Sequence, residues 1–557
     1  MEHMTLEKPD TAAAAETGIA FSEKLGFSRF FLDFISGKSS ALQFFPAQDA
    51  AETARRIDSV TYPRSELAKI LRRQNKQFGS KPEAFARIDL LEDERALVVF
   101  AGQQAGLFGG PLLGFYKALW TVKAASDLSR LLDRPVIPIF WIAADDHDFD
   151  EINHAFVFDM IGEPQRLSYY ESDQPGRPAY QRLLSNTDLC SEMTGTLRDA
   201  LGKTDFSTEV AERLCRAYCQ GTNFVTAFGK FMADTLPDIG LALFSPGDDD
   251  WKKLSSQMYH TILGKHGELK SRIGAANKKL LEAGYHLQVE KEETACHMFM
   301  LTPQREPIHT GANGYQVGET KYSSAELKKL IDTQPERFSP DVFTRPLLSA
   351  HMFPTLVQTG GPSELAYFAQ MSGLYELINR PAPIFMGRLS ATLIEKRFEK
   401  LMTKHNIEFT DFAGDVEQVI NEILGKSFPA DLEKRFADVR RAFRESFDLL
   451  ASEVTSFDKS LEANSGQVWG KINNALENFE KKAFASHKRK LADERAAIYR
   501  AANALFPRRA LQERSISMIY YLSRYGYRIV DYLTAALDVD TTQHQLIYLS
   551  EMDRAGQ

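Results

Sequence analysis

The feature that most constrains the fold is a glycine-rich stretch at residues 101–119, AGQQAGLFGGPLLGFYKAL, which follows the apolar run at 96–100 and leads into an amphipathic pattern. This order predicts a strand, a sharp turn and a helix. Pro111 suits the first helical position, and free N–H groups at a helix start attract anions. We therefore expect substrate or anion contacts from this turn, at Gly102, Gln103, Gln104, Gly106, Gly109 and Gly110.

The spacing of these glycines matches neither GxGxxG nor GxxxxGK[ST]. The usual dinucleotide and P-loop sites are therefore not predicted from a motif. A purely structural glycine turn is an equal alternative for this segment taken alone.

Further apolar runs predict a parallel sheet. The run at 136–142, VIPIFWI, is almost entirely apolar, as in strands that are buried on both faces. Together with 96–100 and the helix between them it predicts a βαβ unit. Three more strands are expected, at 241–244, 355–358 and 383–386.

The strands are separated by long insertions. We expect a largely helical insert near 155–239 and a mixed insert near 265–345. In the second insert, YHLQV at 285–289 and HMFML at 297–301 predict β structure. Ligands of open α/β sheets bind at the carboxyl ends of the strands, so the segments that follow the strands become the candidate site.

An acidic cluster, AADDHDFDEINH, follows the second predicted strand. We expect Asp146, His147 and Asp148 to orient an amine and to accept its proton. Carboxylates could instead bind a divalent ion, and a solvated acidic loop is the bland alternative. Zinc is not favoured, because His147 and His154 would lie two helical turns apart, and no metal is predicted.

A second Gly-Gly-Pro sequence, at 360–362, precedes another amphipathic pattern that has Glu364 in its first turn. After the fifth predicted strand, Arg388 could hold a carboxylate or phosphate, and Ser390 could cap a helix. The substrate or anion contacts expected from these two segments are Gly360, Gly361, Glu364, Arg388 and Ser390.

The chain changes character at about residue 395, where glycine becomes scarce and charge dense. Apolar residues then recur in steps of three and four with one stutter after Phe443, which predicts a long coiled-coil hairpin or dimer arm. We expect an aromatic segment after it to pack back on the main body. The predicted domains are a disordered tail at 1–20, a core at 21–394, a coiled coil at 395–510 and a C-terminal helical segment at 511–557.

Composition limits the kinds of partner that the protein is expected to bind. A net charge of −8, from 67 basic and 75 acidic residues, disfavours a general nucleic-acid surface. No secretory or membrane segment is recognised, which predicts a cytoplasmic protein with small-molecule substrates and no membrane partner. The cysteines lack paired CxxC spacing, so neither a disulfide framework nor a four-thiolate zinc site is expected from Cys190, Cys215, Cys219 and Cys296.

Several motifs occur together in a fixed order. They are GQQAGLFGGPLLGFYKA, FWIAADDHDFDEINH, AGYHLQV, RPLLSAHMFPTLVQTGGPSELAYFAQ, RLSATL and LQERSISMIYYLSRYG. In these motifs the chain resembles the bacillithiol biosynthesis cysteine-adding enzyme family, BshC. It departs from the family pattern at Ala144-Asp145, where Gly-Glu is common, and at Ser363, where Gly is frequent.

The resemblance implies an α/β fold with a Rossmann-like parallel sheet similar to class I aminoacyl-tRNA synthetases, two connecting-peptide inserts and an α-helical coiled-coil domain that supports a homodimer. It also implies a ligase that forms an amide between L-cysteine and the amine of glucosaminyl-malate. Because a free carboxylate is a poor acyl donor, ATP or another adenine nucleotide is possible. The cofactor stays open, because the chain lacks clean HIGH and KMSKS sequences.

Two other functions remain open from the sequence. One is a nucleotide- or phosphate-handling transferase on the same core, without a thiol substrate. The other is a scaffold protein that recruits partners through its coiled coil.

Overall fold

The computed structural model describes residues 18–170, 176–184, 189–424 and 430–555. The chain divides into two compact units. The first comprises residues 1–396 and 504–557, and the second comprises residues 397–503. None of the described helices is both long and apolar enough to cross a membrane.

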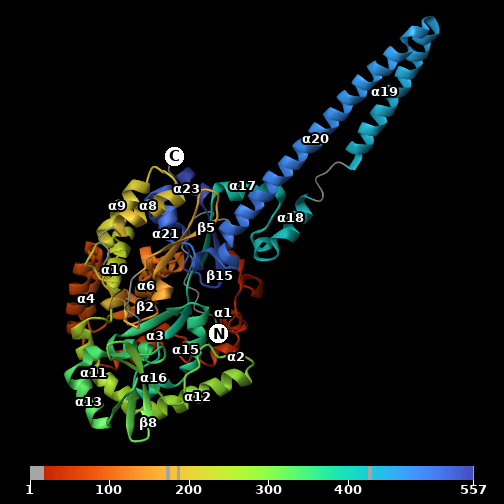
Figure 1. The fold of residues 1–557 in the computed structure, drawn as a ribbon. Helices are drawn as coiled ribbons and strands as arrows, with labels where there is room; N and C mark the ends of the chain where they lie inside the picture. The colour runs from red at the N-terminus through yellow and green to blue at the C-terminus, as the bar shows by residue number, and fades with distance from the viewer. Residues whose placement is uncertain (1–17, 171–175, 185–188, 425–429, 556–557) are drawn as a thin grey trace. The chain divides into compact units, whose positions relative to one another are not determined.

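A five-stranded parallel sheet with the order β13-β12-β2-β3-β6 forms the centre of the first unit (Figure 1). Its strands are β2 (Leu97–Gln103), β3 (Val136–Ile142), β6 (Ala242–Phe244), β12 (Thr355–Gly360) and β13 (Ile384–Gly387). These are the five predicted strands. β2 and β3 pair in register from Leu97 with Val136 to Gln103 with Ile142. Helix α6 (Leu112–Leu132) joins them and packs on both strands, which confirms the βαβ unit.

Five α-helices of the described chain precede β2. They are α1 (Arg29–Ile35), α2 (Ser39–Leu42), α3 (Ala50–Asp58), α4 (Arg64–Phe78) and α5 (Pro82–Asp89). Helix α4 carries buried apolar residues at Leu67, Ile70, Leu71 and Phe78, whose spacing places them on one face. This face packs against β6 and against helix α10 (Phe224–Thr235).

The first insert lies between β3 and β6. It contains the helices α7 (Phe149–Ile152), α8 (Leu189–Leu201), α9 (Ser207–Ala217) and α10, and is therefore largely helical. It also contains an antiparallel hairpin that the sequence did not predict, formed by β4 (His154–Phe158) and β5 (Pro164–Ser168).

The second insert, between β6 and β12, combines helices with a five-stranded sheet of order β10-β9-β8-β7-β11. Its strands are β7 (Ala295–Leu301), β8 (Arg305–Gly311), β9 (Gly314–Val317), β10 (Thr320–Tyr322) and β11 (Phe338–Pro340). Its helices are α11 (Asp249–Gly264), α12 (His266–Glu282), α13 (Ser324–Thr333) and α14 (Thr344–Met352).

Of the two β segments predicted in this insert, 297–301 is confirmed within β7. The prediction for 285–289 is wrong, because these residues form a loop. The backbone N–H groups of Gln288 and Val289 donate to Gln370 Oε1 instead of to a neighbouring strand.

The chain after residue 504 belongs to the first unit, with helices α21 (Met518–Tyr525), α22 (Arg528–Ala536) and α23 (Leu549–Ala555). It also contains strand β15 (Gln543–Tyr548). The prediction of a purely helical segment is therefore wrong at these residues. β15 lies between β14 (Ser390–Ile394) and β1 (Gly18–Ala20) in a three-stranded sheet. The prediction of a disordered tail is therefore wrong for residues 18–20, which form β1. Residues 1–17 lie outside the described part of the chain.

Three further helices follow β12 along the chain. In the first unit, α15 (Pro362–Gln370) and α16 (Leu374–Leu377) lie between β12 and β13. Helix α17 (Lys396–His405) follows β14 and begins the second unit.

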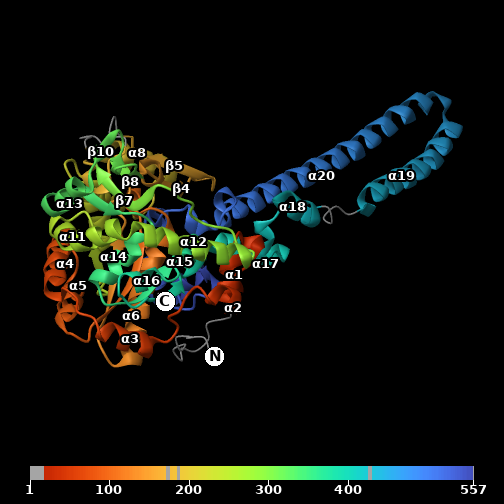
Figure 2. The same ribbon diagram turned by 90° about the horizontal axis from the view of Figure 1, so that it is seen from below.

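The second unit is helical and contains α18 (Val416–Leu424), α19 (Ala430–Phe457) and α20 (Glu462–Leu505), of which the last two form a long hairpin (Figure 2). The ring centroids of Phe436 and Phe479 lie 5.8 Å apart, and those of Phe447 and Trp469 lie 5.7 Å apart. Part of the predicted apolar seam thus makes aromatic contacts between the two helices. The coiled-coil prediction is confirmed.

The cysteines differ from expectation in one respect. Cys215 is disulfide-bonded, whereas Cys219 and Cys296 are free thiols, the first exposed and the second buried. Burial raises the pKa of Cys296 to about 12, so this thiol stays protonated.

Candidate active site

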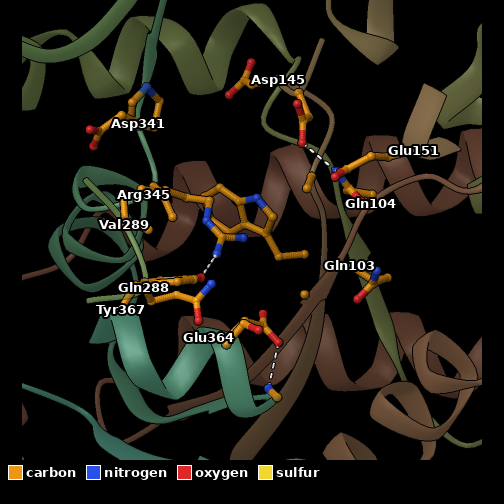
Figure 3. Close-up of a pocket in the computed structure, with 18 of the residues that line it drawn as sticks. Gln103, Gln104, Asp145, Glu151, Gln288, Val289, Asp341, Arg345, Glu364 and Tyr367 are labelled. Atoms are coloured by element: carbon orange, nitrogen blue, oxygen red, sulfur yellow. Dashed lines mark hydrogen bonds between the residues drawn. The ribbon is translucent and has the colours of Figure 1, made fainter. Parts of the chain in front are cut away.

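A cavity of about 730 Å³ opens at the carboxyl ends of the core strands (Figure 3). Its volume is typical of small-molecule sites. The cavity brings together the end of β2, the segment after β3 and the start of α15. The predicted site residues that line it are Gly102, Gln103, Gln104, Asp146, Gly361, Glu364 and Arg388.

The other predicted residues do not line this cavity; they are Gly106, Gly109, Gly110, His147, Asp148, Gly360 and Ser390. The glycine turn is held by its own backbone, because Gly109 N–H donates to Gly106 O at 3.1 Å. A Cβ atom on Gly106 would lie only 2.7 Å from Gly110 Cα. Residues 106–110 of the turn therefore have the purely structural role that the sequence left open as an alternative.

The start of α6 is covered by the chain itself. Pro111 is the N-cap residue rather than the first helical residue, and Leu112 N–H donates to Ile516 O at 2.8 Å. The C-terminal segment thus excludes the anion that the sequence predicted at this N–H group. The cavity borders the end of β2 instead.

Arg388 and Ser390 belong to a buried network. Arg388 lines the cavity, but its Nη2 pairs with Glu513 Oε1 at 2.6 Å and its Nη1 donates to Leu389 O at 2.9 Å. Its charge is thus already compensated by a carboxylate. The prediction that Ser390 caps a helix is wrong, because Ser390 begins strand β14 and its Oγ contacts Glu513 and His544.

A buried ion pair connects the two glycine-containing segments. Lys117 Nζ, on α6, lies 2.6 Å from Glu364 Oε2, and it also donates to Gly102 O at 2.8 Å and to Gln103 Oε1 at 3.2 Å. Glu364 Oε2 accepts a further hydrogen bond from Gly361 N–H, at 2.7 Å. Burial raises the pKa of Glu364, but Lys117 and this N–H group outweigh burial and leave the pKa below its ordinary value.

Lys117 was not among the predicted site residues. Its side chain is 2% exposed. The sequence does carry a signal, because this lysine interrupts the apolar pattern LLGFYKALW on a helix that packs against the sheet. A lysine at a buried helical position requires a charged or hydrogen-bonding partner.

The acidic cluster is organised around Gln104. Gln104 Nε2 donates to Asp146 Oδ2 at 2.7 Å and also to Glu151, and Asp148 N–H donates to Asp146 Oδ1 at 3.2 Å. The structure thus brings Asp146 to the cavity wall. The contribution of Asp148 to this arrangement is its backbone N–H.

His147 lies beside this cluster, and Arg305 Nη1 contacts its Nδ1 at 3.3 Å. Burial and the neighbouring Arg305 lower the pKa of His147, so the imidazole is neutral at pH 7. Since a guanidinium can only donate, Nδ1 accepts and Nε2 carries the proton. The basic nitrogen of His147 is therefore already occupied.

The second insert contributes residues that the sequence did not single out, Lys252 and Arg305. Asp145 pairs with buried Lys252, with 2.7 Å between Oδ1 and Nζ. Arg305 stacks on Phe299 at 3.7 Å from the ring centroid and donates to Ser339 Oγ and Pro340 O. No sequence motif links these positions; only the packing of the second insert on the strand ends brings them together.

Arg345, in the first turn of α14, is a further such residue, and its Nη2 donates to Tyr367 Oη at 2.7 Å. Asp341 fixes this helix start by accepting from the N–H groups of Phe343 and Thr344, at 2.9 and 3.0 Å. Its other oxygen, Oδ2, lies 3.0 Å from Nδ1 of buried His297. Among the described residues, no carboxylate lies within ion-pair distance of Arg345.

The described residues contain no group of three or more histidine, cysteine, aspartate or glutamate side chains that could hold a metal ion. Several polar groups of the cavity wall are paired, as Lys117 is with Glu364 and Gln104 with Asp146.

Comparison with solved structures yields a weak likeness. The crystal structure described as "putative arginyl t-RNA synthetase" from Campylobacter jejuni covers 86% of this chain and 99% of its own, at 9% identity and a TM-score of 0.22. A likeness at this level carries no weight for the fold. The resemblance to class I synthetases stays a prediction from the sequence.

Comparison with protein families is decisive. The N-terminal Rossmann-like domain of bacillithiol biosynthesis BshC matches residues 16–389, and the C-terminal coiled-coil domain of BshC matches residues 391–549. A "Putative cysteine ligase BshC" of Salinibacter ruber is 30% identical over 530 residues, 94% of this chain and 96% of that protein. A protein of the same name from Koribacter versatilis is 31% identical over 523 residues, 91% of this chain and 95% of that protein. The chain therefore belongs to the bacillithiol biosynthesis BshC family.

Proposed function

We propose that this protein is the cysteine ligase of bacillithiol biosynthesis. It joins the carboxyl group of L-cysteine to the amine of glucosaminyl-malate and forms an amide. The names of its relatives support a cysteine ligase. The observation that carries the proposal is the cavity at the strand ends, whose wall contains both cations and carboxylates.

Both substrates carry charges of both signs. Cysteine has an ammonium and a carboxylate group, and glucosaminyl-malate has an amine and two carboxylates. The cations of the cavity wall are Lys117, Lys291, Arg305, Arg345, Arg388 and Arg514. Its carboxylates are Asp145, Asp146, Glu151, Asp341 and Glu364. A wall of mixed charge suits two such substrates better than a wall of one sign.

Asp146 is the proposed general base. When the sugar amine attacks the activated cysteine carbonyl, a carbon–nitrogen bond forms, the bond to the leaving oxygen breaks, and the nitrogen releases one proton. Asp146 accepts this proton, while Gln104 and the Asp148 N–H group hold the carboxylate in place. His147, whose Nδ1 is engaged by Arg305, positions the cluster.

The carboxyl group of cysteine requires activation, and an adenine nucleotide would supply a leaving group on its oxygen. Lys117 is not available to a phosphate, since its ammonium group already has three acceptors. Lys291 and Arg514 are both exposed at the cavity and are better placed to bind a phosphate. We keep ATP or another adenine nucleotide as part of the proposal.

We also infer that the protein acts in the cytoplasm as a homodimer that forms through its second unit, without nucleic-acid or membrane partners. Support for the dimer comes from apolar side chains on α19 that α20 leaves uncovered. Phe443, Leu450 and Phe457 are 53%, 57% and 93% exposed. Such an apolar row on a long helix is typical of an interaction surface.

Metabolite profiles of a strain that lacks the gene test this function. We expect bacillithiol to disappear and glucosaminyl-malate to accumulate. Re-expressing the wild-type chain should restore the thiol, and so should Glu376→Gln, a change at an exposed acid outside the cavity. Asp146→Asn should not restore it. Unchanged bacillithiol in the deletion strain would overturn the proposal in favour of a transferase or a scaffold.

A further inference from the structure

Arg345 presents unused hydrogen-bond donors to the cavity. Its Nη2 is held by Tyr367 Oη at 2.7 Å, whereas Nε and Nη1 have no hydrogen-bond partner among the described residues. A Cβ atom placed on Gly102 would lie 3.5 Å from Nη1, so the guanidinium group lies close to the end of β2. Tyr367 takes only one of the two hydrogens on Nη2, and the other can donate together with Nε–H or with Nη1–H. An arginine fixed in this way is suited to bind a carboxylate through two parallel hydrogen bonds.

Glu364 presents an unused acceptor to the same cavity. Its Oε2 is occupied by Lys117 Nζ and Gly361 N–H, whereas Oε1 has no partner in the part of the chain that the structure describes. The side chain of Glu364 is 22% exposed. Because Lys117 keeps the pKa of Glu364 low, the free oxygen belongs to an ionised carboxylate.

Figure 3 shows Arg345, Tyr367 and Glu364 together on one side of the cavity, with Gln104 and Glu151 on the other side. The first three come from α14 and α15, the other two from the strand end and the acidic cluster. The cavity thus has two chemically different sides.

We infer that the side formed by Arg345, Tyr367 and Glu364 binds the α-amino-acid substrate, with its carboxylate on Arg345 and its ammonium group on Glu364. This inference rests on the proposed function and names the residues that hold the acyl donor. An α-amino acid carries its two opposite charges on groups bonded to one carbon atom, and it therefore matches an adjacent arginine and glutamate. A dicarboxylate such as malate would meet the negative charge of Glu364. The acidic cluster then remains for the sugar amine.

Direct binding measurements test this assignment independently of catalysis. Isothermal titration calorimetry of the full chain with L-cysteine, under reducing conditions, should show binding that weakens about tenfold or more in Arg345→Met and in Glu364→Gln, because each change removes a charged hydrogen bond. Cysteamine, which lacks the carboxylate, and 3-mercaptopropionate, which lacks the amine, should both bind wild-type protein more weakly. Glu364→Gln should no longer discriminate against 3-mercaptopropionate.

A matched control is available on the surface. Arg272 and Glu376 also form an arginine–glutamate pair, at 3.1 Å, but neither lines the cavity. Arg272→Met and Glu376→Gln should bind L-cysteine as the wild type does. Tyr367→Phe, which frees Arg345 without changing any charge, provides a second route if Glu364→Gln does not fold, and it should weaken binding about threefold to tenfold.

Equal L-cysteine affinity in wild type, Arg345→Met and Tyr367→Phe would overturn the assignment, as would a failure of the folded wild type to bind L-cysteine. The proposed function fails separately. If L-cysteine binds in the predicted way but no amide forms with glucosaminyl-malate, the amino-acid site stands and the ligase reaction is excluded.

Discussion

At the scale of single residues, one buried charge organises the site. Lys117 connects the end of β2 to the start of α15, through Gly102 and Gln103 on one side and Glu364 on the other. Burial lowers the pKa of this lysine, and Glu364 opposes that shift. The pair therefore places a free carboxylate oxygen at the cavity without leaving a buried charge alone.

Replacing Lys117 by methionine should destabilise the protein by about 3 kcal/mol, because it leaves a largely buried carboxylate without its partner. The double variant Lys117→Met/Glu364→Gln should be more stable than the single variant, since the unpaired charge is gone. Urea denaturation of both single variants and the double variant measures this coupling. Strictly additive losses would contradict the role of the pair.

At the scale of elements, the C-terminal segment is fixed to the core through buried polar contacts on β14 and β15. His544 Nδ1 lies 2.8 Å from Ser390 Oγ, and its Nε2 lies 2.9 Å from Thr392 Oγ1. Burial lowers the pKa of His544 to about 4, although neighbouring Glu513 opposes the shift. This imidazole is therefore neutral in the folded protein at physiological pH.

The unfolded chain takes up a proton at this histidine below about pH 6.5, whereas the folded chain does so only near pH 4. The contribution of His544 to the free energy of unfolding, about 3 kcal/mol, should therefore be fully present above pH 6.5. It should be lost as the pH decreases toward 4. Denaturation of wild type and His544→Gln across this range measures the effect. The variant should be less stable at pH 7 but should depend less on pH, and equal slopes would argue against the assignment.

The glycine turn gives a second test at this scale. Gly106→Ala should destabilise the protein by about 1–3 kcal/mol, because the new Cβ would lie 2.7 Å from the backbone of Gly110. Gly274→Ala is the matched control: Gly274 lies within helix α12 with nothing within 4 Å of the added Cβ. This control should be neutral or stabilising by up to about 1 kcal/mol. A well-folded Gly106→Ala with an unchanged unfolding midpoint would contradict the structural role of the turn.

The sheet was predictable because each core strand is a short apolar run that ends at a turn. Since parallel strands meet at one edge, the same reasoning led to Gln104, Asp146 and Glu364 in the cavity wall. It did not lead to Arg305 or Arg345. Neither residue follows a core strand, and each approaches the cavity only through packing of the second insert.

Strands β15 and β1 are among those missed, for a related reason. β15 has the sequence QHQLIY, in which polar residues fill the first half, and β1 has only three residues. Neither pattern predicts a strand by itself, because each becomes regular only through its partner. Ser390 was misplaced in the same way: the sequence after the fifth core strand suits a helix cap, but residues 390–394 pair with β15.

At the scale of the whole molecule, the second unit should determine the oligomeric state. Analytical ultracentrifugation of the full chain should show a dimer. Phe443→Glu combined with Leu450→Glu should give a monomer, because both side chains are exposed on α19. The matched control is Arg441→Glu on the same helix, whose side chain is 70% exposed and polar. A wild-type monomer, or a dimer that persists in the double variant, would contradict this interface.

The central claim is amide formation, and one measurement tests it directly. Purified full chain is incubated with L-cysteine and glucosaminyl-malate, with and without ATP, and the amide, the remaining cysteine and any AMP or ADP are quantified together. We expect one amide for each cysteine consumed, formed in step with nucleotide cleavage. Amide formation without nucleotide cleavage would show that the reaction does not consume a nucleotide. No amide from folded protein that binds cysteine, under either condition, would contradict the ligase assignment itself.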